Sequence, residues 1–183
     1  MSEHAFASGI ATPFPADGVG ASTAAESARF QFDALLNRYE QSIFAFLVTM
    51  LGDRDRAKDC TQDTFLRAYQ NLCRGKPVTA QWLFKVARNR AVDSLRRTGR
   101  ERVSAEPLDE VMIEEFTPTG RTMAVQRALL QLSPEDREIL YLHEVDGFTS
   151  YASAEMLGIR AGAVRMRLCR AHVRFRQVYE AER

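Results

Sequence analysis

The chain has 183 residues, of which 45% are hydrophobic and 27% charged, and its formal net charge at pH 7 is +1. This size suits one domain or two small ones with a buried core. No apolar run approaches the roughly 18 residues that suggest a membrane span. The amino terminus has no positive flank followed by an apolar block, so we expect no secretory signal. These features predict a soluble, cytoplasmic protein.

The near-zero net charge hides a segregation of charge along the chain. Residues 26–97 carry 13 basic and 8 acidic side chains, whereas residues 98–122 carry 3 basic and 6 acidic ones. Residues 123–183 lean to the basic side again, with 9 against 8. Two basic-leaning segments therefore flank an acidic connector, which the overall charge does not reveal.

The first part of the chain divides into a tail and a helical segment. Residues 1–25 are rich in Ala, Gly, Ser, Thr and Pro and have no helical period, which predicts a flexible N-terminal tail. Within residues 26–97, apolar residues at steps of three and four predict three helices, over 30–51, 55–72 and 79–97. The polar side of the second helix is either a solvated face or a docking face.

The third predicted helix carries a basic strip. Lys85, Asn89, Asp93 and Arg96 share one side at helical spacing, and Arg88 and Arg97 adjoin it. Such a helix can follow a phosphate backbone, and Trp82 or a neighbouring loop residue could meet an unstacked base. A lone tryptophan on a helix is, however, more often part of the core.

The acidic segment 98–122 contains Pro107 and Pro118 and reads as a linker, partly disordered, with a transient helix around residues 111–116. The domain boundary belongs here. The sequence thus predicts an all-α fold of two small domains, a helical bundle over 26–97 and a second domain over 123–183, joined by a flexible linker.

The second domain has the pattern of a helix-turn-helix. Ser133 and Pro134 mark a helix start, Thr149 can cap a short helix that ends at Gly158, and a longer amphipathic helix begins at Ala161. Residues 160–176 contain six arginines and no acid. The last helix could therefore enter a DNA major groove, although arginine-rich faces are often merely solvated.

Motifs of catalysis and metal binding are missing from the sequence. We find no P-loop, GxGxxG, HExxH or GxSxG, so we expect no enzyme, no cofactor and no metal. Cys60, Cys73 and Cys169 are widely spaced, which favours reduced, partly buried thiols over a disulfide or a metal site. A redox role for Cys60 or Cys73 stays open.

Three motifs follow one another along the chain: DRDRAKDCTQDTFLRAYQNL, WLFKVARNRAVDSLRR, and LSPEDREILYLHEVDGFT followed by LGIRAGAVRMRLCRA. In this order they resemble the extracytoplasmic-function (ECF) class of bacterial sigma-70-family sigma factors. The first is similar to the family's D-A-x-D-x-x-Q-x-x-F segment, the second to W-L-x-x-I-A-R-N-x-x-x-D, and the third to its terminal helix-turn-helix. Together they span about residues 32–178.

This resemblance implies three contact surfaces. A polymerase-docking set would bind the clamp helices of the largest subunit: Asp59, Gln62, Asp63, Phe65 and Arg67. A minus-ten set would meet the melting promoter: Lys76, Arg88, Asn89, Asp93, Arg96 and Arg97. A minus-thirty-five set would meet upstream duplex: Arg160, Gly162, Ala163, Arg165, Met166, Arg167 and Arg170. The acidic linker resembles the segment that threads through polymerase near the active-centre cleft.

The resemblance implies a non-catalytic specificity subunit whose partners are the RNA polymerase core, including its flap region, promoter DNA and an anti-sigma protein. Two other hypotheses remain. An ordinary helix-turn-helix regulator would bind duplex DNA tightly without polymerase. A helical adaptor that binds only protein would not need the arginines of the last helix.

Overall fold

A computed structural model of the chain describes residues 21–101 and 120–181, and the fold in these two ranges is all-helical, with no strand. The helices are α1 (Ala21–Leu51), α2 (Arg54–Cys73), α3 (Ala80–Glu101), α4 (Gly120–Gln131), α5 (Pro134–Leu140), the π-helical turn η1 (Tyr141–Val145), α6 (Ser150–Leu157) and α7 (Ala161–Ala181). The predicted all-α class is confirmed.

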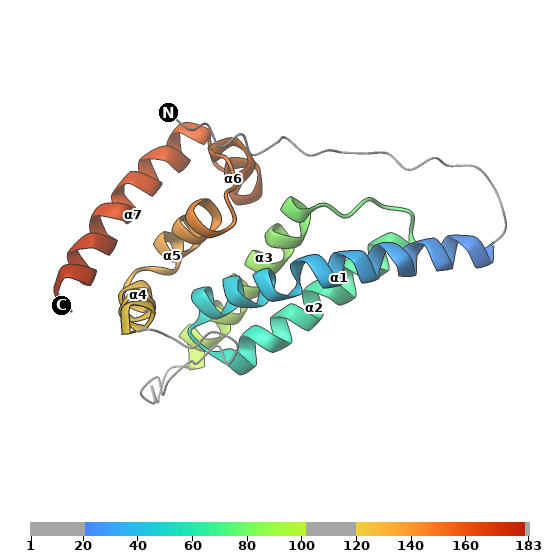
Figure 1. The fold of residues 1–183 in the computed structure, drawn as a ribbon, viewed down its shortest axis with the longest axis horizontal. Coiled ribbons are helices and arrows are strands. Elements are labelled where there is room, and N and C mark those ends of the chain that lie inside the picture. Colours follow the sequence, from blue (N-terminus) through green and yellow to red (C-terminus); the bar gives the residue numbers. More distant parts are fainter. Residues whose placement is uncertain (1–20, 102–119, 182–183) are drawn as a thin grey trace.

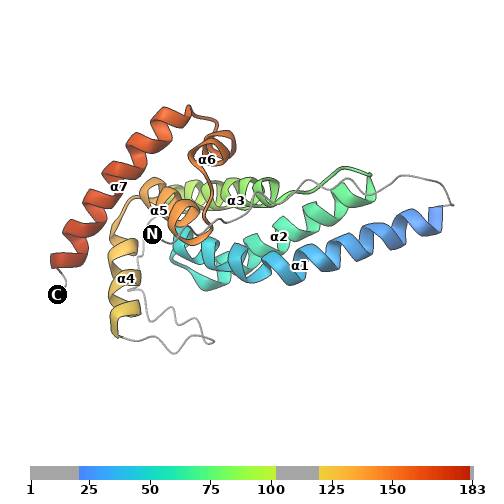
Figure 2. The same ribbon diagram turned by 45° about the horizontal axis from the view of Figure 1, so that its top comes forward.

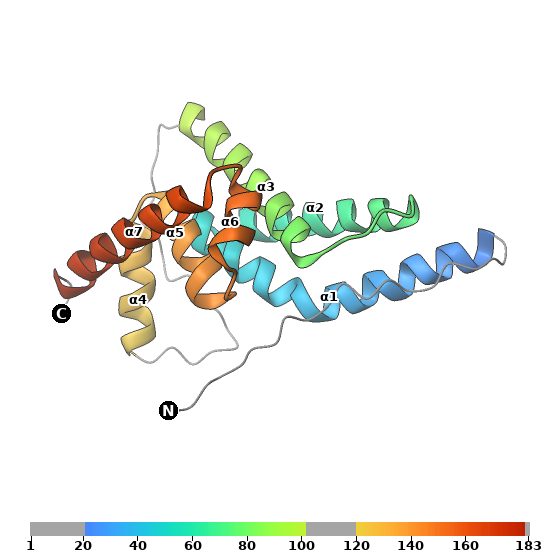
Figure 3. The ribbon, with the colours of Figure 1, turned by 90° about the horizontal axis from the view of Figure 1, so that it is seen from above.

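The helices form two groups that lie side by side (Figure 1). Helices α1, α2 and α3 pack on one another as the first bundle, and α4 to α7 gather near the C-terminal end of α1. The N-terminal half of α1 extends away from the second group in every view (Figures 2 and 3). Contacts of α1 with α5 and of α3 with α6 join the two groups.

The helix boundaries follow the caps that the sequence predicts. The Ser133 hydroxyl accepts a hydrogen bond from the Asp136 backbone N–H at 3.2 Å, and Thr149 does the same for Ala152 at 3.2 Å. These bonds satisfy backbone donors that the first turn of a helix leaves free. Gly158 ends α6 with φ of +66°, a left-handed conformation that glycine adopts without steric cost.

Helix extends beyond the predicted ranges at three places. Helix α1 begins at Ala21, inside the predicted tail, while α3 continues to Glu101 and α4 begins at Gly120, inside the predicted linker. Adding a residue to an existing helix is far easier than nucleating one, so helices readily propagate into flanking segments that lack periodicity. The predicted transient helix at 111–116 lies outside the described residues.

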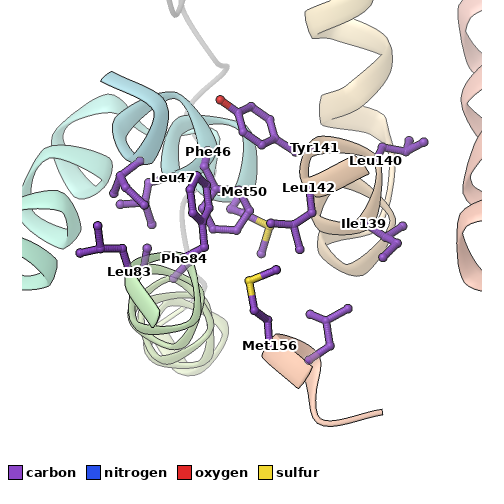
Figure 4. Close-up of a cluster of buried hydrophobic side chains, with 14 of the residues drawn as sticks. Phe46, Leu47, Met50, Leu83, Phe84, Ile139, Leu140, Tyr141, Leu142 and Met156 are labelled. Atoms are coloured by element: carbon purple, nitrogen blue, oxygen red, sulfur yellow. The ribbon is translucent and has the colours of Figure 1, made fainter. Parts of the chain in front are cut away.

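The core is continuous across the two groups of helices (Figure 4). The Phe46 ring of α1 lies 5.5 Å from the Phe84 ring of α3 and 5.4 Å from the Tyr141 ring of η1, centroid to centroid. Phe84 in turn meets Phe148, which precedes α6, at 5.1 Å. Aromatic side chains of the first bundle thus pack directly against the second.

Candidate nucleic-acid interface

Helix α7 has one apolar face and one basic face. Val164 and Ala171 are buried, with Leu168, Phe175 and Val178 packed beside them, and this side contacts α4, α5 and α6. The remaining side faces solvent. It carries most of the predicted minus-thirty-five set, of which Arg160, Gly162, Ala163, Arg165, Met166 and Arg170 are exposed and Arg167 is half-buried.

The start of α7 is open to a ligand. The Arg160 carbonyl accepts hydrogen bonds from the backbone N–H groups of Ala163 and Val164, so Arg160 stands at the helix entrance. A side chain built on Gly162 would meet only the guanidinium of Arg165, at 4.0 Å. An exposed helix start with arginine side chains suits the phosphates and base edges of a DNA groove.

One arginine of this helix has a structural role. Arg174 donates to both carboxylate oxygens of Asp136, through Nε at 2.5 Å and Nη2 at 2.6 Å. Asp136 is buried at the start of α5, and its backbone N–H donates to the capping hydroxyl of Ser133. Arg174 therefore fastens α7 to α5, and its charge is already matched within the domain.

Helix α3 presents the predicted minus-ten set. Asn89, Asp93, Arg96 and Arg97 are exposed on it, and Lys76 is exposed in the loop that precedes it. Trp82 is half-buried and packs against the core, in keeping with its usual structural role. The basic surface of α3 is thus accessible along much of its length, whereas Arg88 and Arg90 are half-buried.

Arg88 points toward the second group of helices. Its Nε donates to Oε1 of Glu138 in α5 at 2.5 Å, and the Glu138 side chain is only 1% exposed. Burial raises the pKa of Glu138, which Arg88 and the more distant charge of Arg167 lower in part. Nothing in the sequence signals this pair, because its partners lie fifty positions apart in different segments.

The polar face of α2 carries the predicted polymerase-docking set. Asp59, Gln62, Asp63 and Arg67 are exposed, and Asp63 lies 3.8 Å from Arg90 of α3. Phe65, the remaining member of this set, is 4% exposed and packs edge-on against Phe32. It belongs to the buried stripe of α2, on the side of the helix away from the exposed polar face.

Two apolar residues of the α2 face were missed in the sequence. Leu66 is 55% exposed and Tyr69 is 38% exposed, one and two turns beyond the carboxylates. Leu66 lies four positions after Gln62, and Tyr69 lies three positions after Leu66. These spacings place them on the same side of a helix, which was the available signal. Exposed apolar side chains within a polar rim are typical of protein-binding surfaces.

Two half-buried titratable groups lie at η1: His143 within it and Asp146 at its C-terminal cap. Burial lowers the pKa of His143 and raises that of Asp146 to about 7, and Oδ2 of Asp146 is buried without a hydrogen-bond partner among the described residues. The turn itself arises where the Asp146 N–H reaches back to the Tyr141 carbonyl at 3.2 Å. Periodicity did not predict this one-residue insertion.

We expect Asp146→Asn to alter the pH dependence of stability. A carboxyl group whose pKa is raised in the folded state contributes stability below its unfolded pKa, and this contribution is lost as pH rises toward 7. Between pH 4.5 and 8 the free energy of unfolding of the wild type should therefore fall by about 1 kcal/mol or more relative to that of the variant. Urea denaturation of both proteins at each pH measures this difference. Parallel pH curves would contradict it.

The cysteines form no linked site. All three are free; Cys60 is half-buried, while Cys73 and Cys169 are exposed rather than partly buried as expected. Burial and then the Asp63 carboxylate raise the pKa of Cys60, which disfavours its reactive thiolate. Among the described residues no three His, Cys, Asp or Glu side chains gather as a metal site. No helix in the described ranges is both long and apolar enough to cross a membrane.

Family models match both groups of helices. Sigma-70 region 2 matches residues 35–101, and Sigma-70 region 4 matches residues 122–174. The ECF sigma factor SigL of Mycobacterium tuberculosis is 33% identical over 160 residues, covering 82% of this chain and 88% of SigL. The ECF sigma factor SigE of Mycolicibacterium smegmatis is 29% identical over 84% of this chain, which spans 63% of the length of SigE.

Solved structures share the fold. The sigma factor RpoE in complex with the anti-sigma factor NepR, from Bartonella quintana, matches with a TM-score of 0.71 at 24% identity, over 84% of this chain and 99% of that one. CnrH in complex with the cytosolic domain of CnrY matches with a TM-score of 0.64 at 22% identity, over 88% and 96%. Two family models in the expected order, together with the relative SigL, establish the family. The chain belongs to the ECF class of sigma-70-family RNA polymerase sigma factors.

Proposed function

We propose that this chain is a dissociable promoter-specificity subunit, whose segment 26–97 binds core RNA polymerase and helps to open the minus-ten element while segment 123–183 anchors the upstream duplex. The observation that carries this proposal is the presence of two basic, exposed helix faces, on α3 and on α7, in separate groups of helices. One chain with two such faces suits two separated DNA elements.

The α7 face supports duplex recognition. In helix-turn-helix proteins the N-terminal residues of the second helix meet base edges in the major groove, and flanking basic residues meet phosphates. Gly162, Ala163, Arg165 and Met166 occupy the first two turns of α7 and are exposed. We assign base-edge contact to this group and phosphate contact to Arg160, Arg167 and Arg170.

The α3 face supports contact with melted DNA. Arg96, Arg97 and Asn89 follow one exposed side of the helix, and Lys76 extends this charge into the preceding loop. A cationic groove with adaptable polar groups holds a single strand largely through its backbone. We therefore assign the whole minus-ten set, which includes Arg88 and Asp93, to strand opening.

The α2 face supports docking on polymerase. Exposed carboxylates and amides beside Leu66 and Tyr69 give a mixed surface of the kind found in protein interfaces. We propose that Asp59, Gln62, Asp63 and Arg67 contact the clamp helices of the largest subunit. The acidic sequence of segment 98–122 suits a path through a channel that normally holds RNA phosphates.

This role also implies where and how the chain works. It would act in the cytoplasm, with DNA and polymerase, as a non-catalytic subunit without a cofactor. RpoE and CnrH were each solved in complex with another protein, described as an anti-sigma factor for RpoE. We propose that an anti-sigma protein likewise occludes this chain, since the α2 face is open to such a partner.

Reconstitution with core polymerase tests the proposal. Run-off transcription on genomic fragments should give discrete start sites only when the chain is added to the core enzyme. Tight palindrome binding by the chain alone, without directed initiation, would instead identify an ordinary helix-turn-helix regulator. Initiation that persists unchanged after the α7 arginines are replaced would identify a protein-binding adaptor.

The double variant Asp59→Ala with Gln62→Ala should bind core polymerase more weakly. Each exposed polar contact is worth about 0.5–1.5 kcal/mol, so the dissociation constant should rise about fivefold or more. Fluorescence anisotropy of the labelled chain measures this. Glu40→Ala, which removes an exposed carboxylate from α1, is the matched control and should bind as the wild type does. Equal losses in both variants would point to a nonspecific charge effect.

A further inference from the structure

The contact between the two groups of helices holds an arginine that the proposed function assigns to promoter DNA. Arg88 of α3 belongs to the minus-ten set, and its Nε donates a hydrogen bond to Oε1 of Glu138 in α5 at 2.5 Å. The Arg88 side chain is 25% exposed, whereas its neighbours Asn89, Arg96 and Arg97 are open to solvent. Nε is engaged with Glu138, and Nη1 donates to Oδ1 of Asn89 at 3.5 Å. While these contacts hold, the guanidinium offers a phosphate only part of its donor set.

Two more polar contacts hold α5 and η1 against α1. Arg137 donates from Nη1 to the Thr49 carbonyl at 3.0 Å, and the Tyr141 hydroxyl donates to the Ser42 carbonyl at 3.3 Å. Thr49 lies in the last turn of α1, where carbonyls lack helical partners and the helix dipole favours a cation. These bonds therefore fix the second group at one end of α1.

The Arg88–Glu138 pair contributes little to the net stability of the closed chain. Burial is the largest influence on Glu138 and raises its pKa, so desolvation outweighs the attraction of Arg88 and Arg167. A buried pair of this kind adds little net stability, yet removing one partner leaves an uncompensated charge and is strongly destabilising. The contact between the two groups of helices therefore depends on the pairing of Glu138 with Arg88.

We propose that this contact is an autoinhibitory latch, in which Glu138 holds the Arg88 guanidinium in the closed chain so that domain closure and minus-ten binding exclude each other. The identity of the competing ligand, promoter DNA, rests on the proposed function. The latch itself rests on contacts within the chain. When Arg88 binds a DNA phosphate, Glu138 loses its counter-charge. The two groups of helices then separate, and Glu138 becomes solvated.

Spin labels on the two exposed cysteines can measure this closure. Cys73 ends α2 and Cys169 lies in α7, so Cys60→Ser leaves one label site in each group. Electron–electron resonance on the unbound chain should give one narrow distance distribution. Arg88→Ala should broaden and lengthen it, because Glu138 would be buried unpaired. Adding Glu138→Gln to Arg88→Ala should restore the narrow distribution, because the neutral amide needs no counter-charge.

Arg96→Ala is the matched control, since it removes an exposed arginine from the same helix and should leave the distribution unchanged. A narrow distribution in Arg88→Ala identical to the wild type overturns the latch, as does one that Glu138→Gln fails to restore while circular dichroism shows full helicity. In the promoter complex with core polymerase the long distance should dominate. A short distance there overturns mutual exclusion.

The two proposals fail in different experiments. The distance measurements on the free chain need neither polymerase nor promoter, so they judge the latch alone. Run-off transcription by the wild type judges the proposed function alone. If the distances change as expected but the chain directs no initiation, the contact between Arg88 and Glu138 is established. Promoter DNA is then excluded as the ligand that competes for Arg88.

Discussion

Phe46→Ala should lower the free energy of unfolding by about 3–5 kcal/mol, the range for removing a buried phenylalanine ring. Phe46 is 0% exposed, and its ring meets Phe84 within the first bundle and Tyr141 of the second group. The cavity would therefore open where the two groups share their core (Figure 4). Urea denaturation followed by circular dichroism measures the loss.

Phe30→Ala is the control for this prediction. The residue type and the helix are the same, but Phe30 is 74% exposed, so its removal should change stability by no more than about 0.5 kcal/mol. Because Phe46 touches both groups, its variant should also broaden the distance between labels on Cys73 and Cys169. A large destabilisation with an unchanged distance would mean that Phe46 supports only its own bundle.

The predictable part of the fold follows from local chemistry. Ser133, Thr149 and Gly158 each act within a few residues of their own position, and the structure confirms all three. The apolar stripe of α7 likewise needed only spacing, and Val164 and Ala171 are buried as that stripe predicts. Caps and periodicity are properties of short windows, which a single sequence records directly.

The remaining features depend on partners that are distant in the sequence. Arg174 reads as one more arginine of a basic helix until Asp136 of α5 is seen beside it. Arg88 reads as a free DNA contact until Glu138 is placed against it. Tertiary pairing was the missing information in each case.

The largest effect on promoter binding should come from Arg165→Ala. Arg165 is exposed in the second turn of α7, where recognition helices meet base edges, so its loss should weaken holoenzyme binding by about 1–3 kcal/mol, or about 5- to 150-fold. Binding to a fragment with a scrambled minus-thirty-five element should change little. The variant would thus lose discrimination as well as affinity, as competition between the two fragments would show.

Arg160→Ala should behave differently, because Arg160 stands at the helix entrance and is assigned to phosphate. Its loss should weaken binding to both fragments alike and reduce the slope of log affinity against log salt concentration by about 1. Arg176→Ala is the control for both, since it removes an exposed arginine about 16 Å beyond Arg165 along the same helix, at 1.5 Å per residue. If all three variants lost affinity equally, the α7 face would attract DNA only by its net charge, and the docking geometry that assigns base edges to Arg165 would be wrong.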